Sequence, residues 1–398
     1  MTTSASSPPN SRDAAWPWSP KPTRSPRKTC WAPSASPSGG PRSCLRSTWC
    51  GDRMRCVDVD PRSDACWAKL AACQAGCLFT SPPWLEAICG TFGLPAEARL
   101  ALDASDRPVA GFAWVPVNDL RGTRYSALPF SDRADPMVTD VATWQALSAD
   151  ALSAGVPLTV RCWEDAAPAR DSRMVTVGGL AWHGTPLDAP LDELYRRLSG
   201  TARRNIARAR RAGVRVVATA EQDAMHAFHR LHLRLRKRKY RLLAQPPELF
   251  DRIWQSFAPR DAVVTLLAYE QHTLIAGAVF LVWNDVLYYK FGASLHEHLA
   301  LRPNDALFWA GIEWGARRNL AWVDWGCSDD DQPGLIAYKR KWASEQRRIV
   351  TLRQAEARSP GHHEADALLG ELTALLTEES VPDHVTARAG RLLYRYFC

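Results

Sequence analysis

An acidic side chain occurs inside a short apolar segment in the second half of the chain. Asp324 lies between Val323 and Trp325, so a strand at this position would bury its carboxylate. Burial raises the pKa of a carboxylic acid, and a carboxylate with a raised pKa is suited to act as a base. The same side chain is equally suited to capping the loop that carries Ser328 and Asp329, and both interpretations stay open.

A strand predicted over 286–291 carries two adjacent polar side chains, Tyr289 and Lys290. Successive strand residues point to opposite faces, so one of the two should face any cleft beside the strand. Tyr289 is suited to donate a proton or contact a substrate, although an aromatic residue in a strand also suits a packed core. Asn304 follows Pro303 at a predicted helix start, where it either orients a polar group or only supports the turn.

The helix predicted over 201–212 is rich in arginine. Small and apolar residues recur on it at helical spacing and predict a narrow packing stripe of Ala202, Ile206 and Ala209. Basic residues repeat on the far side, at Arg204, Arg208 and Arg211. These guanidinium groups could hold the phosphates of CoA, tRNA or a nucleotide-linked sugar. The alternative interpretation is a solvated face between domains.

Positive charge is concentrated in two segments of the chain. The net charge is +8, yet residues 196–241 alone hold fifteen Arg or Lys against two acidic residues, a local excess of +13. Residues 1–53 add +6, so the remainder of the chain is acidic. A general role in coating polyanions is therefore not expected, because that role needs basic character spread over the surface.

Neither the cysteines nor the histidines predict a metal site. Eight of the eleven cysteines precede residue 90, and paired CxxC spacing is missing from Cys66, Cys73 and Cys77. Histidines recur every third residue on a predicted helix and are expected at its surface or boundary: His226, His229 and His232. The irregular cysteine spacing, the lack of a signal sequence and the lack of a membrane-length apolar run predict a reduced, cytoplasmic protein without a transmembrane segment.

Composition and periodicity divide the chain into four parts. Residues 1–53 are rich in Pro, Ser and Arg and are expected to be disordered, or to be an extension upstream of a true start at Met54. Residues 54–185 and 186–357 each alternate helical and strand patterns and predict two α/β domains. Residues 358–398 predict a helical tail.

Local signals add detail to these domains. Asn284-Asp285 between two apolar runs predicts a tight hairpin, and Ser81 before two prolines predicts a helix start. Residues 121–136 show no regular pattern and are expected to be irregular.

An ordered set of motifs in the second half carries a family resemblance. The motifs are Ser199–Ile206, Tyr288–Ser294, Leu301–Asn304, Asp324–Ser328 and Gly334–Lys339. Their order and spacing resemble the Fem-like double-GNAT proteins, which include peptidoglycan-bridge aminoacyltransferases and many GNAT acetyltransferase relatives. The resemblance covers about residues 55–355 and is looser in the first half, where it rests on Leu78–Trp84 and Pro129–Asp132.

The resemblance implies an α/β (α+β) fold of two tandem GNAT-like domains, each with a mixed, largely antiparallel sheet flanked by helices. It implies an N-acyltransferase in which Lys339 contacts the acyl donor or the reacting centre. Without the resemblance, the sequence favours a solvated lysine on an amphipathic helix, beside Arg340 and Lys341; the resemblance makes the two interpretations of Lys339 equal. Asp324 and Tyr289 complete the expected catalytic set. Donor binding is expected at Arg204, Arg208, Arg211 and Asn304.

Three functions follow. The first is transfer of an acyl group, expected to be acetyl, from acetyl-CoA or another acyl-CoA to an amine of an amino sugar, amino acid or cell-envelope precursor. The second is aminoacyl transfer from tRNA to a peptidoglycan precursor, and the third is a non-catalytic tRNA- or nucleic-acid-binding module. The chain lacks the long coiled-coil insertion that often helps to hold tRNA, and it also lacks an obvious Gly-rich pyrophosphate loop. Direct attack by the amine needs neither a metal nor a covalent nucleophile, and the sequence leaves the oligomeric state open.

Overall fold

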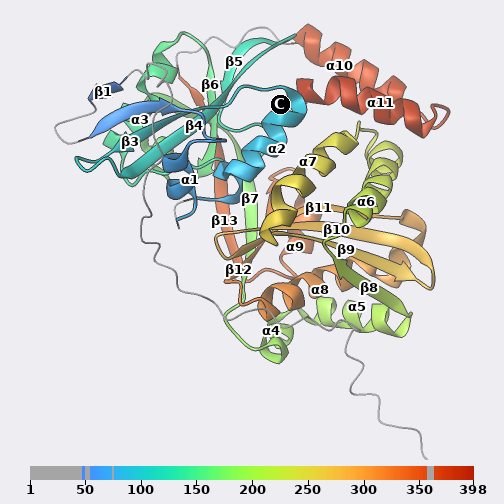
Figure 1. Ribbon diagram of the computed structural model, residues 1–398. Helices are drawn as coiled ribbons and strands as arrows, with labels where there is room; N and C mark the ends of the chain where they lie inside the picture. Colours follow the sequence, from blue (N-terminus) through green and yellow to red (C-terminus); the bar gives the residue numbers. More distant parts are fainter. Residues whose placement is uncertain (1–46, 50–53, 74–75, 356–362) are drawn as a thin grey trace, which may run out of the picture.

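The computed structural model describes residues 47–49, 54–73, 76–355 and 363–398 (Figure 1). The predicted extension over 1–53 therefore lies outside the described residues, apart from 47–49. The first half contains these elements in order: β1 (Ser47–Trp49), β2 (Arg55–Val59), α1 (Ala65–Ala71), η1 (Leu78–Thr80), α2 (Pro82–Phe92), β3 (Glu97–Leu102), β4 (Pro108–Asp119), β5 (Gly122–Ser126), α3 (Val141–Ser153), β6 (Leu158–Trp163), η2 (Ala167–Arg170) and β7 (Met174–Pro186).

The second half continues the alternation of helices and strands. Its elements are α4 (Leu191–Arg197), α5 (Gly200–Arg211), β8 (Val214–Thr219), α6 (Gln222–Leu235), η3 (Arg236–Tyr240), α7 (Pro247–Phe257), η4 (Ala258–Arg260), β9 (Val263–Glu270), β10 (Thr273–Trp283), β11 (Val286–Ser294), η5 (His296–Leu301), α8 (Pro303–Arg317), β12 (Trp322–Asp329), α9 (Pro333–Lys339) and β13 (Glu345–Gln354). The tail forms α10 (His363–Leu376), α11 (Asp383–Leu393) and η6 (Tyr394–Phe397).

Local sequence signals explain where several elements begin. The Ser81 hydroxyl accepts the Trp84 N–H at 3.4 Å and starts α2, with Pro82 and Pro83 in the first turn. At the β10–β11 hairpin, Asn284 and Asp285 both have positive φ, 47° and 59°, which is the conformation that a tight two-residue turn requires. The predicted hairpin is therefore confirmed.

All described strands join one sheet in the order β1-β2-β3-β4-β5-β6-β13-β7-β12-β11-β10-β9-β8. Most neighbouring pairs are antiparallel, but β5–β6 and β11–β12 are parallel. The two halves exchange strands at the middle, because β13 enters between β6 and β7, and β7 pairs with β12. The predicted fold class of two α/β halves with mixed, largely antiparallel sheets is confirmed.

Helices cover both faces of the second half of the sheet. In Figure 1, α6 and α7 lie on one side of β8–β11, and α5 and α8 lie on the other. The α6 and α7 side shares a core with the first half, whereas α5 and α8 build a separate core around Phe280 and Trp325. The predicted stripe on α5 is confirmed, since Ala202, Ile206 and Ala209 are fully buried.

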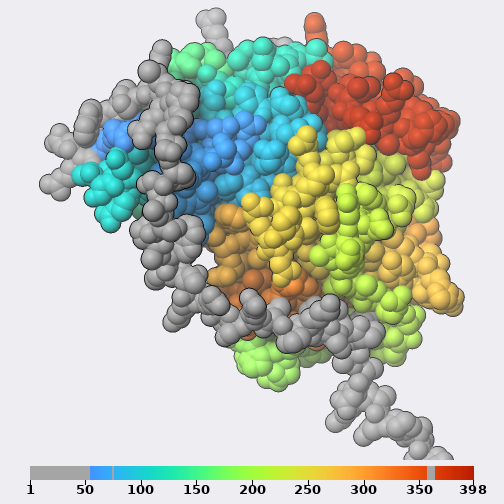
Figure 2. All heavy atoms as spheres, viewed as in Figure 1, coloured from blue at the N-terminus to red at the C-terminus, as the bar shows by residue number. Residues whose placement is uncertain are grey.

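The helical tail lies across both halves of the protein. Lys237 of η3 pairs with Asp383 of α11 at 2.8 Å, and Arg391 pairs with Glu248 of α7. In Figure 2 the red tail lies against the cyan part of the first half and against the yellow α7. Among the described residues, no helix is long and apolar enough to cross a membrane.

Candidate active site

The central strands β11 and β12 separate shortly after they meet. Their parallel pairing joins Val286–Tyr288 to Trp322–Asp324 and ends there, so the following residues diverge. Each strand also carries an irregularity beyond this point: the β10–β11 register shifts between Val279 and Phe280, and the β12–β7 register shifts after Asp324. These bulges change the direction of the side chains at Lys290 and Asp324 from the one that a regular sheet would give them.

Lys290 is the extra residue of the β11 bulge, because Tyr289 pairs with Phe280 while Phe291 pairs with Val279. Its ammonium group lies 3.1 Å from Oδ1 of Asp132, and only 8% of the Lys290 side chain is exposed. The same ammonium group lies 4.6 Å from the ring centre of Phe79 and 4.9 Å from that of Trp84. A carboxylate and two aromatic faces therefore hold this buried cation.

The β12 bulge brings Asp324 and Asp132 towards the same glycine. Gly326 has a φ of +69°, and its N–H donates to Oδ1 of Asp324 at 2.7 Å. A Cβ at Gly326 would lie 2.9 Å from Oδ2 of Asp132, so a larger residue would displace that carboxylate. Burial raises the pKa of Asp324, nearby Arg133 opposes this shift, and the charge of Asp132 adds to it.

Lys339 lies near Asp132, Asp324 and Lys290. The side chain is buried, and Nζ donates to the carbonyl oxygen of Cys327 at 2.7 Å. Burial lowers the pKa of Lys339, although the nearby Cys327, Asp132 and Asp324 all favour its charged form. The structure thus places Lys339 and Asp324 close enough to influence the Lys290–Asp132 pair electrostatically.

A cavity of about 490 Å³ opens beside the Lys290–Asp132 pair, between the two halves of the protein. We call it the interdomain cavity. Residues from α2, the loop before residue 133, α6, η3, the segment between η3 and α7, α7, β11, the turn before α9 and the tail line it: Trp84, Ile88, Phe130, Asp132, His232, Leu235, Arg236, Tyr240, Leu242, Gln245, Leu249, Lys290, Phe291, Gly292, Gln332 and Tyr394. Asp324 lines a different cavity of about 490 Å³, together with Arg133 and Tyr288.

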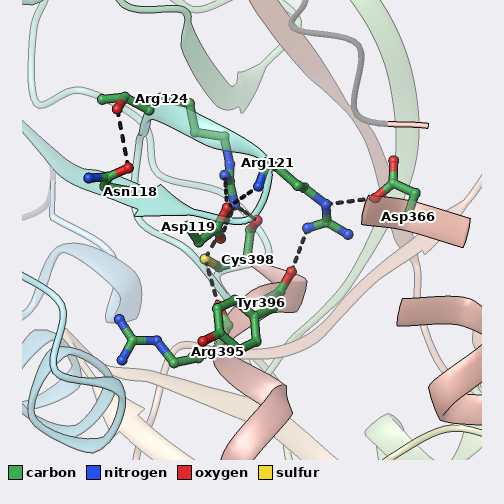
Figure 3. A network of polar contacts seen from close by, with 9 residues as sticks. Asn118, Asp119, Arg121, Arg124, Asp366, Arg395, Tyr396 and Cys398 are labelled. Atoms are coloured by element: carbon green, nitrogen blue, oxygen red, sulfur yellow. Dashed lines mark hydrogen bonds and ion pairs between the residues drawn. The ribbon is translucent and has the colours of Figure 1, made fainter. Parts of the chain in front are cut away.

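The end of the tail contributes Tyr394 to the wall of the interdomain cavity, where its ring packs on Phe92 and Phe130. Beyond Tyr394, the polar network in Figure 3 holds Tyr396 and Cys398 against the β4–β5 hairpin. Arg121 donates to the carbonyl oxygen of Tyr396 at 2.5 Å, and Arg124 donates to that of Cys398 at 2.8 Å. The hairpin of the first half therefore fixes one wall of the cavity.

Tyr289 does not line the interdomain cavity, whereas the Cys327 thiol lies beside the pair, 4.0 Å from the carbonyl oxygen of Asp132. The Tyr289 ring packs against Phe280, Phe308 and Trp325 in the core on the α8 side, and burial raises its pKa. Of the two adjacent strand residues, Lys290 is thus the one that lines the cavity. Burial raises the pKa of the Cys327 thiol to about 12, so the thiol carries a proton at neutral pH.

The predicted donor-binding residues form a second group. Arg204, Arg208 and Arg211 are exposed on α5, and none forms an ion pair with any residue that the structure describes. Asn205 of the same helix donates to Asp305 at 3.1 Å in the first turn of α8. The adjacent Asn304 donates to the Ser294 hydroxyl at 3.2 Å, at the end of β11.

Two of the three histidines are buried, so the expectation of a surface or boundary position is wrong for them. His232 donates from Nε2 to Oε1 of Gln245 at 2.6 Å, and burial lowers the pKa of His232 to about 3. His229 lies 3.2 Å from the Gln245 carbonyl oxygen. Within the described parts of the chain, no group of three or more His, Cys, Asp or Glu residues is arranged to hold a metal ion.

The sequence did not single out Asp132 as a site residue, although it marked Pro129–Asp132 as part of the family resemblance. The residue lies in a stretch without periodicity, 158 positions before its partner Lys290. Only the strand exchange and the two bulges bring these positions together.

Comparisons with known proteins agree with this architecture. The family model of the acetyltransferase (GNAT) domain matches residues 196–340. No curated protein matches the chain by sequence. The crystal structure of FemX is similar to 71% of this chain and 93% of its own, with a TM-score of 0.56 and 14% identity.

A tandem GNAT protein from the clavulanic acid biosynthesis pathway is similar over 75% of this chain and 98% of its own, with a TM-score of 0.45 and 14% identity. The FemX likeness shows the fold, and the family match identifies the second half. Residues 196–340 therefore match the acetyltransferase (GNAT) domain, and the fold of the chain is similar to that of FemX.

Proposed function

We propose that this protein transfers an acyl group from a CoA thioester to an amine of an amino sugar, amino acid or cell-envelope precursor, by direct attack of the amine. The observation that carries the proposal is the pairing of the buried Lys290 with the partly exposed Asp132 on the wall of the interdomain cavity. A cation and a carboxylate at one point of a cleft supply the two functions that acyl transfer needs.

In the proposed reaction, Asp132 accepts the proton that the attacking amine loses as its new N–C bond forms. Lys290 stabilises the negative charge that develops on the carbonyl oxygen. The thioester C–S bond then breaks, and the leaving CoA thiolate takes up the proton that Asp132 accepted. Lys339 and Asp324 adjust the electrostatic potential at this point, because both lie buried beside the pair. Tyr289 supports the strand through its core contacts.

The donor's phosphates are assigned to Arg204, Arg208 and Arg211, with Asn304 nearby. These arginines fit phosphate groups because they are exposed and form no ion pair with a described residue. A cytoplasmic location, where acyl-CoA is available, belongs to the same proposal.

The exposed arginines also favour a second candidate, aminoacyl transfer from tRNA to a peptidoglycan precursor. Thermal shift with CoA, acetyl-CoA, a UDP-linked muropeptide and aminoacyl-tRNA separates the two, because each ligand stabilises the protein that binds it. Stabilisation by CoA compounds, and release of free CoA when an amine is added, is the expected result. Binding to tRNA with no response to CoA would replace the first candidate with the second.

A non-catalytic nucleic-acid-binding module is the third possibility. It would bind tRNA with an affinity that falls steeply with salt, and it would turn over neither acyl-CoA nor aminoacyl-tRNA.

A further inference from the structure

The cavity that Asp324 lines is separate from the interdomain cavity, and we call it the tryptophan cavity. Its volume is about 490 Å³, a size typical of small-molecule sites. Phe79 of η1 lies between the two cavities. Its ring contacts Tyr288, which lines the tryptophan cavity, and also Lys290, which lines the interdomain cavity. The tryptophan cavity is therefore a neighbour of the proposed reaction centre and not a part of it.

Three tryptophans line this cavity, and only one of them offers an open ring. Cations already lie over the Trp163 ring, with Arg133 at 4.5 Å and Arg347 at 3.9 Å from its centre. Trp182 is buried and packs edge-on against Trp163 at 5.3 Å. Trp322 is partly exposed, and no cation of the described residues lies over its ring. Trp322 therefore presents flat apolar surface to a ligand.

Polar groups without partners lie around the same space. The Nε atom of Arg133 and the indole nitrogen of Trp182 are buried and form no hydrogen bond with any residue that the structure describes. Burial raises the pKa of Asp324, and Trp182 opposes this shift, so the indole N–H lies near that carboxyl. Glu345, at the start of β13, is exposed and has no ion-pair partner within the described chain. Buried polar groups left without partners indicate a bound ligand or water.

Simple ligand classes fit this lining poorly. A hydrocarbon would leave the N–H groups of Arg133 and Trp182 without water. An anion would meet the carboxylates of Asp324 and Glu345, and a small cation would meet the arginines over Trp163. A neutral ring with hydroxyl groups satisfies the whole lining. Each hydroxyl both donates and accepts, while the C–H face of the ring packs on an aromatic surface.

We propose that the tryptophan cavity binds a saccharide through a neutral pyranose ring, whose C–H face packs on Trp322. The hydroxyl groups of this ring donate to Glu345 and accept from the N–H groups of Trp182 and Arg133. The proposal goes beyond the acyl transfer, because it concerns binding at a cavity that neither residue of the reacting pair lines.

Calorimetric titration with N-acetylglucosamine tests the class of ligand. Cyclohexanol, sodium acetate and methylammonium chloride are the matched probes for an apolar ring, an anion and a cation. N-acetylglucosamine should bind, and each of the other three should bind more weakly. No binding of N-acetylglucosamine, or tighter binding of any of the other probes, would overturn the proposal.

Variants of the cavity wall test its place. Trp322→Leu keeps an apolar side chain but loses the flat ring, so the Kd for N-acetylglucosamine should rise about 10-fold or more. The control Trp254→Leu makes the same change at a partly exposed tryptophan of α7 that lines neither cavity, and its Kd should equal that of the wild type. If Trp322→Leu does not fold, the exposed Glu345→Gln serves instead, and its Kd should rise about 3-fold or more.

Fluorine NMR of the protein labelled with 5-fluorotryptophan locates the ligand without reference to affinity. The resonances of Trp322 and Trp254 are identified by their loss in the two leucine variants. Addition of N-acetylglucosamine should shift the Trp322 resonance and leave that of Trp254 in place. An unmoved Trp322 resonance, or an unchanged Kd in the folded wall variants, would show that the sugar binds elsewhere and would overturn the proposal. These measurements contain no acyl-CoA, so their outcome is independent of the proposed acyl transfer.

Discussion

The ammonium group of Lys290 lies 3.1 Å from Oδ1 of Asp132, although the two residues belong to different halves of the chain. One comes from the bulge in β11 and the other from the loop that precedes Arg133. The pair depends on both halves, so the chemistry proposed for the second half is completed by the first. The following predictions rest on this relationship and on the residues around it.

Lys290→Met and Asp132→Asn should each lower kcat by about 10²-fold or more, because the first removes the cation proposed to stabilise the oxyanion and the second removes the proposed base. Binding of acyl-CoA should change by less than 3-fold. Initial rates of CoA release and calorimetric titration with acyl-CoA measure the two quantities. The exposed Lys69→Met serves as a control and should behave as the wild type. Full turnover in either site variant would remove the pair from the mechanism.

Lys339→Met should lower kcat about 10-fold, because a buried cation next to Asp132 and Asp324 is lost. The carbonyl oxygen of Cys327 also loses its donor, which costs roughly 1–3 kcal/mol of unfolding free energy. Lys341→Met, two residues further along the chain, is the matched control. If both variants lose activity equally, Lys339 has no special role in turnover.

Replacing Arg204, Arg208 and Arg211 together by alanine should raise the KM for acyl-CoA about 10-fold or more with kcat nearly unchanged. The expected cause is the loss of charge-assisted hydrogen bonds to phosphates. Steady-state kinetics at two salt concentrations measure the effect, which should shrink at high salt. A triple variant at the exposed Arg107, Arg170 and Arg260 removes the same charge elsewhere. An equal rise in KM there would show that net charge alone is responsible.

Acid should destabilise the protein through His232. The unfolded histidine gains its proton near pH 6.5, whereas the folded one stays neutral down to about pH 3. The unfolded state therefore binds more protons in this window, and the free energy of unfolding falls as the pH drops through it. The fall in the free energy of unfolding is limited to about 5 kcal/mol, because each unit of difference in pKa corresponds to about 1.36 kcal/mol.

In urea unfolding experiments, His232→Gln should show a shallower dependence on pH between about pH 6 and pH 4, although its stability at neutral pH is lower. His272→Gln, at an exposed position, should keep the wild-type slope. A wild-type slope in His232→Gln would mean that this histidine titrates normally in the folded protein.

The contacts that hold the tail should affect substrate binding. Arg121→Ala removes the bonds to Asp366 and to the Tyr396 carbonyl oxygen (Figure 3), so Tyr394 should lose its fixed place in the cavity wall. We expect a rise in KM of about 3- to 10-fold and a lower melting temperature. Arg107→Ala removes an ion pair of the exposed turn at Asp103 and serves as the control. An unchanged KM would show that the tail does not shape the site.

Elements with strong local signals could be predicted from the sequence. The helix that begins after Ser81 and the Asn284–Asp285 hairpin follow from cap and turn chemistry, and they occur as expected. The small-residue stripe on α5 could also be predicted, because its packing depends on helical spacing alone.

Features that depend on distant pairing could not be predicted in this way. The strand β5 lies in a stretch expected to be irregular, and its pairing with β4 and β6 supplies what the local pattern lacks. The insertion of β13 between β6 and β7 leaves no local signature either. The bulge that turns Lys290 towards Asp132 likewise depends on the register with β10, which no single segment encodes.

Measuring CoA release in single turnovers of wild type and Asp132→Asn, both saturated with the same acyl-CoA and amine, tests the central claim most directly. The account predicts that the wild type releases one CoA for each acylated amine, and that Asp132→Asn binds the donor equally well but reacts at least 100-fold more slowly. Equal rates in the two proteins, or amine modification by the wild type from aminoacyl-tRNA alone, would contradict it.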